Sequence, residues 1–301
     1  MSGIVPQLKV PITLPPKGKS LNDYTWEEIN NISKAGKARE YFSVGDRKAI
    51  TINGTVGTQS LNTTLYAYII GFDHNGATNT IDFGTFKSDL SGGKDMAFKD
   101  GKYDGYSTDG TKYYNMSHWS NANYGGWKGS DLRYDILGST DVAPSTYGSS
   151  ATSGRTGSDA TSTCATNPVP NTLMAALPVD LRAVMKPMTI YTDNVSGDAS
   201  DPESDITASI DYLPLLSEFE ILGKRVQTSY HEQNYQKQYE YFISGNSVQK
   251  YRFGASSNTC KWWTRSLCLN STMSFAFIST NGSSTSGGAR QSYGIAPIFR
   301  V

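Results

Sequence analysis

The sequence lacks any apolar run long enough to cross a membrane as a helix. Its longest apolar stretches, residues 65–72 and 172–177, are far shorter than the roughly 20 residues that such a helix needs. An excess of one charge is also absent, because 27 basic side chains balance 27 acidic ones. No long-range field therefore draws the chain to nucleic acid or anionic lipid. We expect a soluble protein with no membrane insertion and no nucleic acid as partner.

Cysteine is scarce, and the three that are present, Cys164, Cys260 and Cys268, cannot all pair within one chain. An odd count fits folding in a reducing cytoplasm better than a secreted disulfide framework. A bridge between Cys260 and Cys268 stays open as an alternative. Residues 1–16 contain no continuous apolar stretch of the signal-peptide type. We therefore expect synthesis in the cytoplasm, and release by lysis if the protein leaves the cell.

Metal-binding spacings are missing as well. The three histidines are far apart and belong to no His-x-x-His or Glu-x-x-His pair: His74, His118 and His231. Asp100, Asp104 and Asp109 alternate with glycines, but the oxygen spacing and terminal glutamate of an EF-hand are absent. The sequence predicts no metal site and no cofactor, and leaves open only a loosely bound calcium ion held by loop oxygens.

No catalytic constellation stands out in the sequence. There is no Gly-x-Ser-x-Gly elbow, and the side chains of Glu218 and Glu220 would not face each other on a helix. Cys260 and Cys268 have no histidine nearby in the sequence to activate them. We therefore expect that the protein is not an enzyme, and keep an unrecognised enzymatic site as an alternative.

The residues that are plentiful are small, polar or aromatic. The chain contains 29 glycines and 19 tyrosines, and only 18% of its residues are charged. Such a composition indicates a loop-rich protein whose polar surface consists of hydroxyls and amides. Tyrosine, serine and asparagine make adaptable contacts at low entropic cost, which is typical of binding surfaces.

The first residues favour an extended arm followed by a helix. Four prolines within residues 1–20 exclude a helix there, and such an arm often attaches to a neighbouring subunit. Thr25 and Glu28 form a capping box, apolar residues continue at helical spacing, and Gly36 supplies a stop. The pattern predicts one amphipathic helix over residues 25–35.

Two antiparallel strands are predicted next, at residues 49–52 and 65–72, with Asn53-Gly54 as a hairpin signal. Residues 91–130 and 138–168 are rich in glycine and polar residues, so we expect long ordered loops there, pinned by tryptophans. The sequence contains no internal repeat, which excludes solenoid and propeller folds.

The second half of the chain mixes helical and strand patterns. Residues 171–185 predict a core-facing helix capped by Asn171 and broken near Pro178. In residues 230–243 the aromatic positions 235, 239 and 242 fall on one helical stripe. Four short strands are predicted after them, over residues 248–253, 261–265, 274–279 and 293–301.

Several motifs, taken in their order along the chain, resemble those of a known domain family. The last third contains Trp262-Trp263-Thr264-Arg265-Ser266, the turn Asn281-Gly282, and Gly294-Ile295-Ala296-Pro297-Ile298-Phe299. Further motifs lie upstream: Trp26-Glu27-Glu28-Ile29, Tyr41 to Asp46, Ile69 to His74, His118-Trp119, Asp131-Leu132-Arg133-Tyr134 and Asn171 to Pro178. Together they resemble an uncharacterised domain family common in phages and prophages of gut Firmicutes.

The order of these motifs is similar to the C-type-lectin fold in its formylglycine-generating-enzyme-like branch. That branch includes phage receptor-binding proteins diversified by retroelements. The resemblance implies an α+β, C-type-lectin-like fold of short antiparallel strands, a few helices and long ordered loops. We expect residues 1–20 to form an N-terminal arm and residues 21–301 to form one such domain with inserted loops.

The resemblance also implies a ligand surface near the C-terminus, on a rigid scaffold. Trp262 and Trp263 are adjacent on a predicted strand, so one can fill the core while the other faces the ligand surface. We favour core packing for both, and keep Trp263 as a candidate for the ligand surface. The candidate ligand-binding residues are Asn258, Thr259, Trp263, Asn270, Ser271, Thr272, Thr280, Asn281, Ser283, Arg290 and Tyr293. The candidate scaffold residues are Trp262, Arg265, Ser266, Gly282 and Gly294. Ordinary solvated loops and core packing are the alternatives for these positions.

The function that these expectations favour is that of a bacteriophage virion protein. Its C-terminal loops would bind a protein or glycan of the host cell surface, and its arm would attach it to other virion proteins. Weak single contacts gain most from multivalency, so a homo-oligomer is expected, with a trimer as its form. The alternative is an architectural virion protein, such as a capsid decoration, neck or tail component, with no host-binding role.

Overall fold

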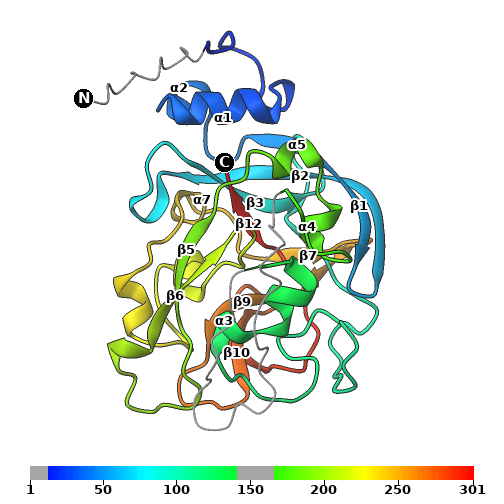
Figure 1. The fold of residues 1–301 in the computed structure, drawn as a ribbon, viewed down its shortest axis with the longest axis vertical. Helices are drawn as coiled ribbons and strands as arrows, with labels where there is room; N and C mark the ends of the chain where they lie inside the picture. The colour runs from blue at the N-terminus through cyan, green and yellow to red at the C-terminus, as the bar shows by residue number, and fades with distance from the viewer. Residues whose placement is uncertain (1–12, 141–165) are drawn as a thin grey trace, which may run out of the picture.

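The computed structural model describes residues 13–140 and 166–301 of the chain (Figure 1). Within these residues, most strands pair antiparallel with their neighbours, and the helices are few and short. The protein is therefore α+β with mostly antiparallel strands, as the sequence predicts. The predicted segment 138–168 falls largely on residues 141–165, outside the described residues, and so do Cys164 and residues 1–12 of the predicted arm.

A curled four-stranded sheet holds the N-terminal half together with the last strand. Its order is β1 (Arg47–Val56), β2 (Gln59–Phe72), β3 (Ile81–Lys87) and β12 (Ile298–Arg300). The predicted hairpin is present as β1 and β2, but its turn lies at residues 57 and 58, and Asn53 pairs with Asn62 inside the ladder. The longer strands bury Val56 and Leu61, and Gly57 adopts the positive φ of +56° that the turn requires. Asn53-Gly54 was therefore the wrong position for the turn.

The predicted N-terminal helix is confirmed as α1 (Trp26–Lys34). Thr25 and Glu28 form its capping box, and Gly36 follows it at φ +69°. Trp26 packs edge-on against Phe83 of β3 and Phe299 of β12, at ring-centroid distances of 5.4 and 5.8 Å. Helix α1 therefore covers one face of the four-stranded sheet (Figure 1).

The described part of the N-terminal arm lies against its own chain. The hydroxyl of Tyr24 donates to the carbonyl of Pro16 at 2.7 Å, and that of Tyr41 donates to the carbonyl of Pro15 at 2.8 Å. Lys17 forms an exposed ion pair with Glu40 of α2 (Ala38–Tyr41). These contacts fix residues 15–17 beside the helices.

Three smaller sheets complete the strand content of the described residues. They are β4 (Met96–Ala97), β7 (Lys250–Arg252) and β8 (Ala255–Cys260); β9 (Trp262–Leu267), β10 (Ser274–Ile278) and β11 (Ser284–Gly288); and β5 (Met188–Asp193) with β6 (Ile206–Asp211). The four predicted C-terminal strands correspond to β7, β9, β10 and β12. Strands β8 and β11 were not predicted, because their serine-rich and threonine-rich sequences lack apolar alternation.

The predicted helix over residues 171–185 breaks at Pro178, as expected, into α4 (Leu173–Ala176) and α5 (Val179–Arg182). Its cap is Thr172, whose hydroxyl accepts from the backbone N–H of Ala175, and not Asn171, which has φ +61°. The continuous helical stripe predicted in residues 230–243 is wrong. Only η5 (His231–Asn234) and α7 (Glu240–Ile243) form there. The backbone N–H of Tyr239 donates to the backbone carbonyl of Glu220, so it is not available for a helical hydrogen bond.

The remaining helical turns are short: η1 (Leu21–Asp23), η2 (His74–Gly76), α3 (Gly126–Gly129), the π-helix η3 (Leu132–Leu137), η4 (Glu203–Asp205) and α6 (Glu218–Leu222). No helix of the described residues is long and apolar enough to span a bilayer. Of the two tryptophans expected to pin the loop over residues 91–130, Trp127 is fully buried, whereas Trp119 is 61% exposed. Of these two tryptophans, only Trp127 therefore anchors the loop in the core.

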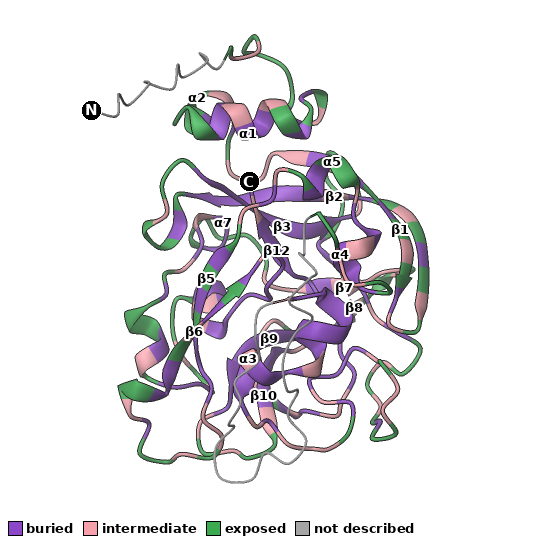
Figure 2. Ribbon diagram, in the orientation of Figure 1, coloured by how far each residue is buried: buried purple, intermediate pink, exposed green. Residues whose placement is uncertain are grey.

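Burial runs through the centre of the molecule from the four-stranded sheet to β9 and β10 (Figure 2). Every residue of β3 and every residue of β9 is buried. Buried ion pairs lie inside this core, among them Arg265 with Glu220, Arg133 with Asp211 and Lys87 with Asp95. The exposed residues gather at the strand ends and in the loops, where a ligand surface must be sought.

Candidate functional site

The predicted C-terminal ligand residues divide between the two ends of one strand. Residues 270–272 lie in the turn between β9 and β10, and residues 280–283 lie in the turn between β10 and β11. Strand β10 has 5 residues between these turns, a length of about 16 Å. Asn258 and Thr259 belong to β8, in a different sheet. The structure therefore does not gather the predicted residues into one continuous patch.

Two of the predicted ligand residues are buried. Trp263 is 0% exposed and Tyr293 is 2% exposed, and their rings pack together at 4.6 Å between centroids. The indole N–H of Trp263 donates to the carbonyl of Tyr114 at 3.0 Å, while that of Trp262 donates to the carbonyl of Val248 at 3.2 Å. The candidate role of Trp263 at a ligand surface is wrong, because other elements cover both faces of β9.

The predicted scaffold residues have defined internal contacts. Arg265 donates to both carboxylate oxygens of Glu220, at 2.6 and 2.7 Å, and to the carbonyl of Leu215 at 2.7 Å. The hydroxyl of Ser266 donates to Glu232 at 2.8 Å. Gly282 has φ +88°, and a side chain at Gly294 would meet the sulfur of Cys260 at 2.6 Å. These positions hold the strands in place.

An exposed surface surrounds the turn between β9 and β10. The guanidinium of Arg290 lies 4.9 Å from the ring centre of Tyr106, which is 53% exposed. The amide of Asn121 contacts both the sulfur of Met273, at 3.4 Å, and the backbone of Arg290. Trp119 is two residues away from Asn121 and is also exposed. Arg290 and residues 270–272 therefore adjoin aromatic and amide side chains from the loop over residues 106–121.

A groove lies elsewhere, between η2, β5 and the segment over residues 233–238. It has two adjoining parts that share Asn75, Gly76, Tyr191 and Tyr235 in their walls. The smaller part has a volume of about 350 Å³ and reaches His74, Glu220, Tyr239 and Arg300. The larger part is about 760 Å³ and opens over amide side chains: Gln233, Asn234, Gln236 and Gln238. Sequence analysis did not predict this groove.

Two tyrosines form an aromatic platform in the groove wall. The rings of Tyr191 and Tyr235 are stacked, with centroids 5.0 Å apart and planes 21° from parallel. Each side chain stays 36% exposed. The hydroxyl of Tyr235 donates to Glu203 at 3.0 Å, and the amide of Gln236 donates to the carbonyl of Tyr191 at 2.8 Å. The platform is thus held rigidly while its rings remain accessible.

A histidine with an unsatisfied nitrogen lies in the wall of the smaller part. The ring of His74 stacks on that of Tyr239 at 3.6 Å and is 8% exposed. Its Nε2 atom is buried without a hydrogen-bond partner. Burial lowers the pKa of His74, so the neutral imidazole is favoured. A buried nitrogen without a partner is unfavourable, and an ordered water molecule could satisfy it.

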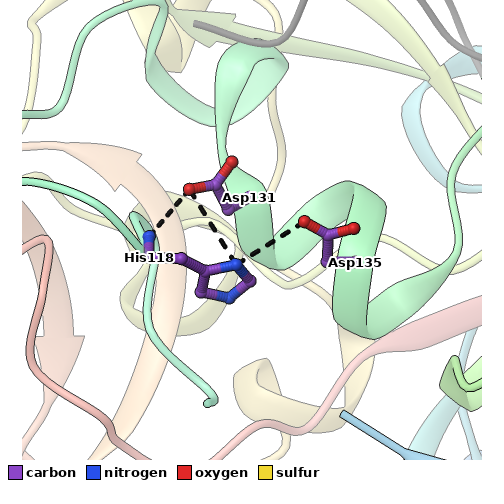
Figure 3. Close-up of side chains that lie close together, drawn as sticks. All are labelled: His118, Asp131 and Asp135. Atoms are coloured by element: carbon purple, nitrogen blue, oxygen red, sulfur yellow. Dashed lines mark hydrogen bonds and ion pairs between the residues drawn. The ribbon is translucent and has the colours of Figure 1, made fainter. Parts of the chain in front are cut away.

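A second constellation is built from the loop before α3 and the start of the π-helix (Figure 3). The Nδ1 atom of His118 lies 3.5 Å from an oxygen of Asp135 and 4.0 Å from an oxygen of Asp131. The backbone N–H of His118 donates to Asp131 at 2.7 Å. The other oxygen of Asp135 lies 3.0 Å from the ammonium of Lys112. The side chains of His118, Asp131 and Asp135 are 2%, 12% and 11% exposed, whereas that of Lys112 is 53% exposed.

The sequence did not predict this cluster because the histidine and the carboxylates are 13 or more positions apart. The available signal was the spacing of Asp131 and Asp135, which puts both carboxylates on one face of a helical turn. The three aspartates considered for calcium have other partners instead. Asp100 accepts from Ser292, Asp104 pairs with Lys261, and Asp109 accepts from Ser107 and Thr111.

The two described cysteines are free thiols buried in the core. Burial raises the pKa of Cys260 to about 11 and that of Cys268 to about 12. A thiol with a raised pKa is a poor nucleophile at neutral pH because little thiolate is present. The open alternative of a bridge between Cys260 and Cys268 is not realised in the structure.

Comparison with known proteins gives one match. The model of a family described as a domain of unknown function (DUF6273) matches residues 107–301. No curated protein and no solved structure matches the chain significantly. The matched range includes the cluster at His118 and most of the groove wall, but not η2.

Proposed function

Because this chain belongs to the DUF6273 family, whose function is unknown, we propose from its own chemistry that it is a non-enzymatic binding protein. In this proposal it is a component of a bacteriophage particle and recognises a ligand on the host cell surface. The finer fold that we propose is C-type-lectin-like, with which the α+β architecture and mostly antiparallel strands are compatible.

The observation that carries the proposal is the groove with its stacked tyrosines. A ligand site is expected to be concave, with apolar or aromatic walls and a few polar groups that fix orientation. The platform of Tyr191 and Tyr235 supplies the aromatic surface, and the exposed amides of Gln233 and Asn234 supply donors and acceptors. This combination suits a neutral, polyhydroxylated ligand, and a surface saccharide is the class that we propose.

The exposed surface around Arg290 and residues 270–272 is the second contact area in the proposal. Its aromatic and amide side chains suit adaptable contacts with a protein or glycan. It adjoins the candidate residues at one end of β10, whereas residues 280–283 lie at the other end. If each of the two areas binds its ligand weakly, a homo-oligomer would strengthen the overall binding through multivalency. The oligomer that we propose is a trimer.

A catalytic role for the groove finds little support in its lining. The described residues of its walls include no serine or cysteine that could act as a nucleophile. Glu220 is held by Arg265, and Arg300 is held by Asp82 at 2.6 Å. Each of these two charged groups is neutralised by its own ion-pair partner and is not presented to a substrate.

Replacing Tyr235 with alanine should weaken saccharide binding by at least about tenfold, because a stacking surface is lost. The binding saccharide would be identified on an array of bacterial surface glycans, and its affinity measured by calorimetry. Tyr230→Ala is the matched control, because Tyr230 is 56% exposed and outside the groove lining. Binding that survives Tyr235→Ala but not Thr272→Ala would move the site to the C-terminal loops, and no binding to any glycan would contradict the saccharide class.

The setting in a virion is tested by immunogold electron microscopy of phage particles from the source, with an antibody against residues 21–301. We expect label at the tail tip or fibres, where host recognition takes place. Label over the head or neck would favour the alternative of an architectural virion protein. Particles without label would overturn the virion assignment.

A further inference from the structure

The orientation of the His118 ring is fixed by the backbone. Its Nε2 atom lies 3.1 Å from the carbonyl oxygen of Tyr113, and a carbonyl oxygen can only accept a hydrogen bond. Nε2 therefore carries a hydrogen, and Nδ1 points toward Asp131 and Asp135 (Figure 3). Histidines that bind metals commonly donate their other N–H to a backbone carbonyl or carboxylate in this way.

The spacing of the three side chains decides between a proton and a metal ion as the group that they share. A charge-assisted N–H···O bond closes to about 2.8 Å. The Nδ1 atom of His118 is instead 3.5 Å from Asp135 and 4.0 Å from Asp131. Two ligands that are each about 2.1 Å from one tetrahedral ion are about 3.4 Å apart. Both separations are too long for a closed hydrogen bond, and the 3.5 Å separation is that of two ligands around one ion, whereas the 4.0 Å separation would have to shorten by several tenths of an ångström when an ion binds.

Both carboxylates are oriented by groups outside the cluster. Asp131 accepts from the backbone N–H of His118, and Asp135 pairs through its other oxygen with Lys112. The ligand atoms of all three residues lie within 4.8 Å of one another. Lys112 is 53% exposed at its side chain, so solvent screens its repulsion of a second cation. A site of this kind needs little rearrangement to accept an ion.

We propose that His118, Asp131 and Asp135 bind a divalent transition-metal ion of the zinc type. An imidazole nitrogen with two carboxylate oxygens suits such ions, whereas calcium and magnesium prefer oxygen ligands alone. The proposed site is separate from the groove, with which it shares no lining residue.

The bound ion joins two segments of the chain. The carbonyl of His118 accepts from the backbone N–H of Gly110, so the histidine is part of the loop over residues 110–118. The carboxylates belong to the start of η3. Metal binding therefore cross-links this loop to the π-helix and steadies the exposed Trp119, which follows the histidine directly.

The test uses the full chain, freed of metal with EDTA and titrated with zinc in a calorimeter. We expect one equivalent of zinc to bind and to raise the melting temperature. His118→Ala and Asp135→Asn should each weaken zinc binding by at least about tenfold. His231→Ala is the matched control, because His231 is outside the cluster and should leave zinc affinity unchanged.

Cobalt gives a reading that does not depend on any variant folding well. The wild-type protein with cobalt should show the visible absorption of a site with nitrogen and oxygen ligands, and zinc should displace it. An intense thiolate charge-transfer band would place the metal on a cysteine and overturn the proposal. The proposal also fails if no zinc binds and nitrogen NMR shows a second proton on His118, since the cluster would then be an ion pair.

Discussion

Replacing Arg265 with methionine is expected to lower the free energy of unfolding by about 3–5 kcal/mol. Arg265 and Glu220 are each 1% exposed, and the arginine satisfies both oxygens of the carboxylate. Without the arginine, the carboxylate of Glu220 would be buried and uncompensated, and the carbonyl of Leu215 would lose its donor. Urea unfolding at neutral pH, followed by circular dichroism, measures the difference.

The matched control is Arg39→Met, which removes an exposed ion pair with Glu240. The two side chains of that pair are 57% and 37% exposed, and a pair of this kind contributes about 1 kcal/mol or less. A double variant with Glu220→Gln and Arg265→Met should recover part of the lost stability, because no buried charge remains. An Arg265→Met variant as stable as Arg39→Met would contradict the assigned role of the buried pair.

Replacing Glu232 with glutamine is expected to stabilise the protein at alkaline pH. Burial raises the pKa of Glu232 to about 8, and the side chain is 1% exposed. A carboxyl whose pKa is raised on folding adds stability below its unfolded pKa, and this stability is lost as the pH rises through the folded pKa. The wild type should therefore lose stability between about pH 4.5 and pH 8, whereas the glutamine, which cannot ionise, avoids this loss.

The expected difference at pH 8 to 9 is of the order of a few kcal/mol. Glutamine can keep the contacts of Glu232, since Oε1 accepts from the backbone N–H of Asp193 and the other position contacts the hydroxyl of Ser266. Thermal unfolding of both proteins from pH 5 to pH 9 measures the effect. Glu27→Gln, at an exposed position of α1, is the control. A variant that is less stable than the wild type at pH 9 would contradict the conclusion that Glu232 is a buried carboxyl with a raised pKa.

The elements that the sequence predicts well are those specified by local interactions. Helix α1 is specified by Thr25 and Glu28 within a single turn. Strand β8 could not be predicted in the same way, because its exposed Ser256, Ser257 and Asn258 carry no apolar alternation. Its position depends on pairing with β7, which only the folded chain reveals.

The sites depend even more on tertiary structure. The alternation rule left Trp263 as a candidate for a surface because it assumes that one face of a strand is exposed, and β9 is covered on both faces. The groove joins η2 to residues 233–238, more than 150 positions away, so no local pattern could indicate it. In the cluster, Asp131 and Asp135 have a helical spacing, but His118 comes from a loop without regular structure.

The pairing of β3 with β12 has a consequence for synthesis on the ribosome. Asp82 and Arg300 contact each other across 218 positions, and β3 is buried along its whole length. A nascent chain that has not yet reached residue 298 exposes one edge of β3, with its apolar residues, for most of its elongation. Such unpaired edges invite association between chains. A chaperone that covers this edge during synthesis should therefore raise the yield of folded protein more than stabilising the finished fold does.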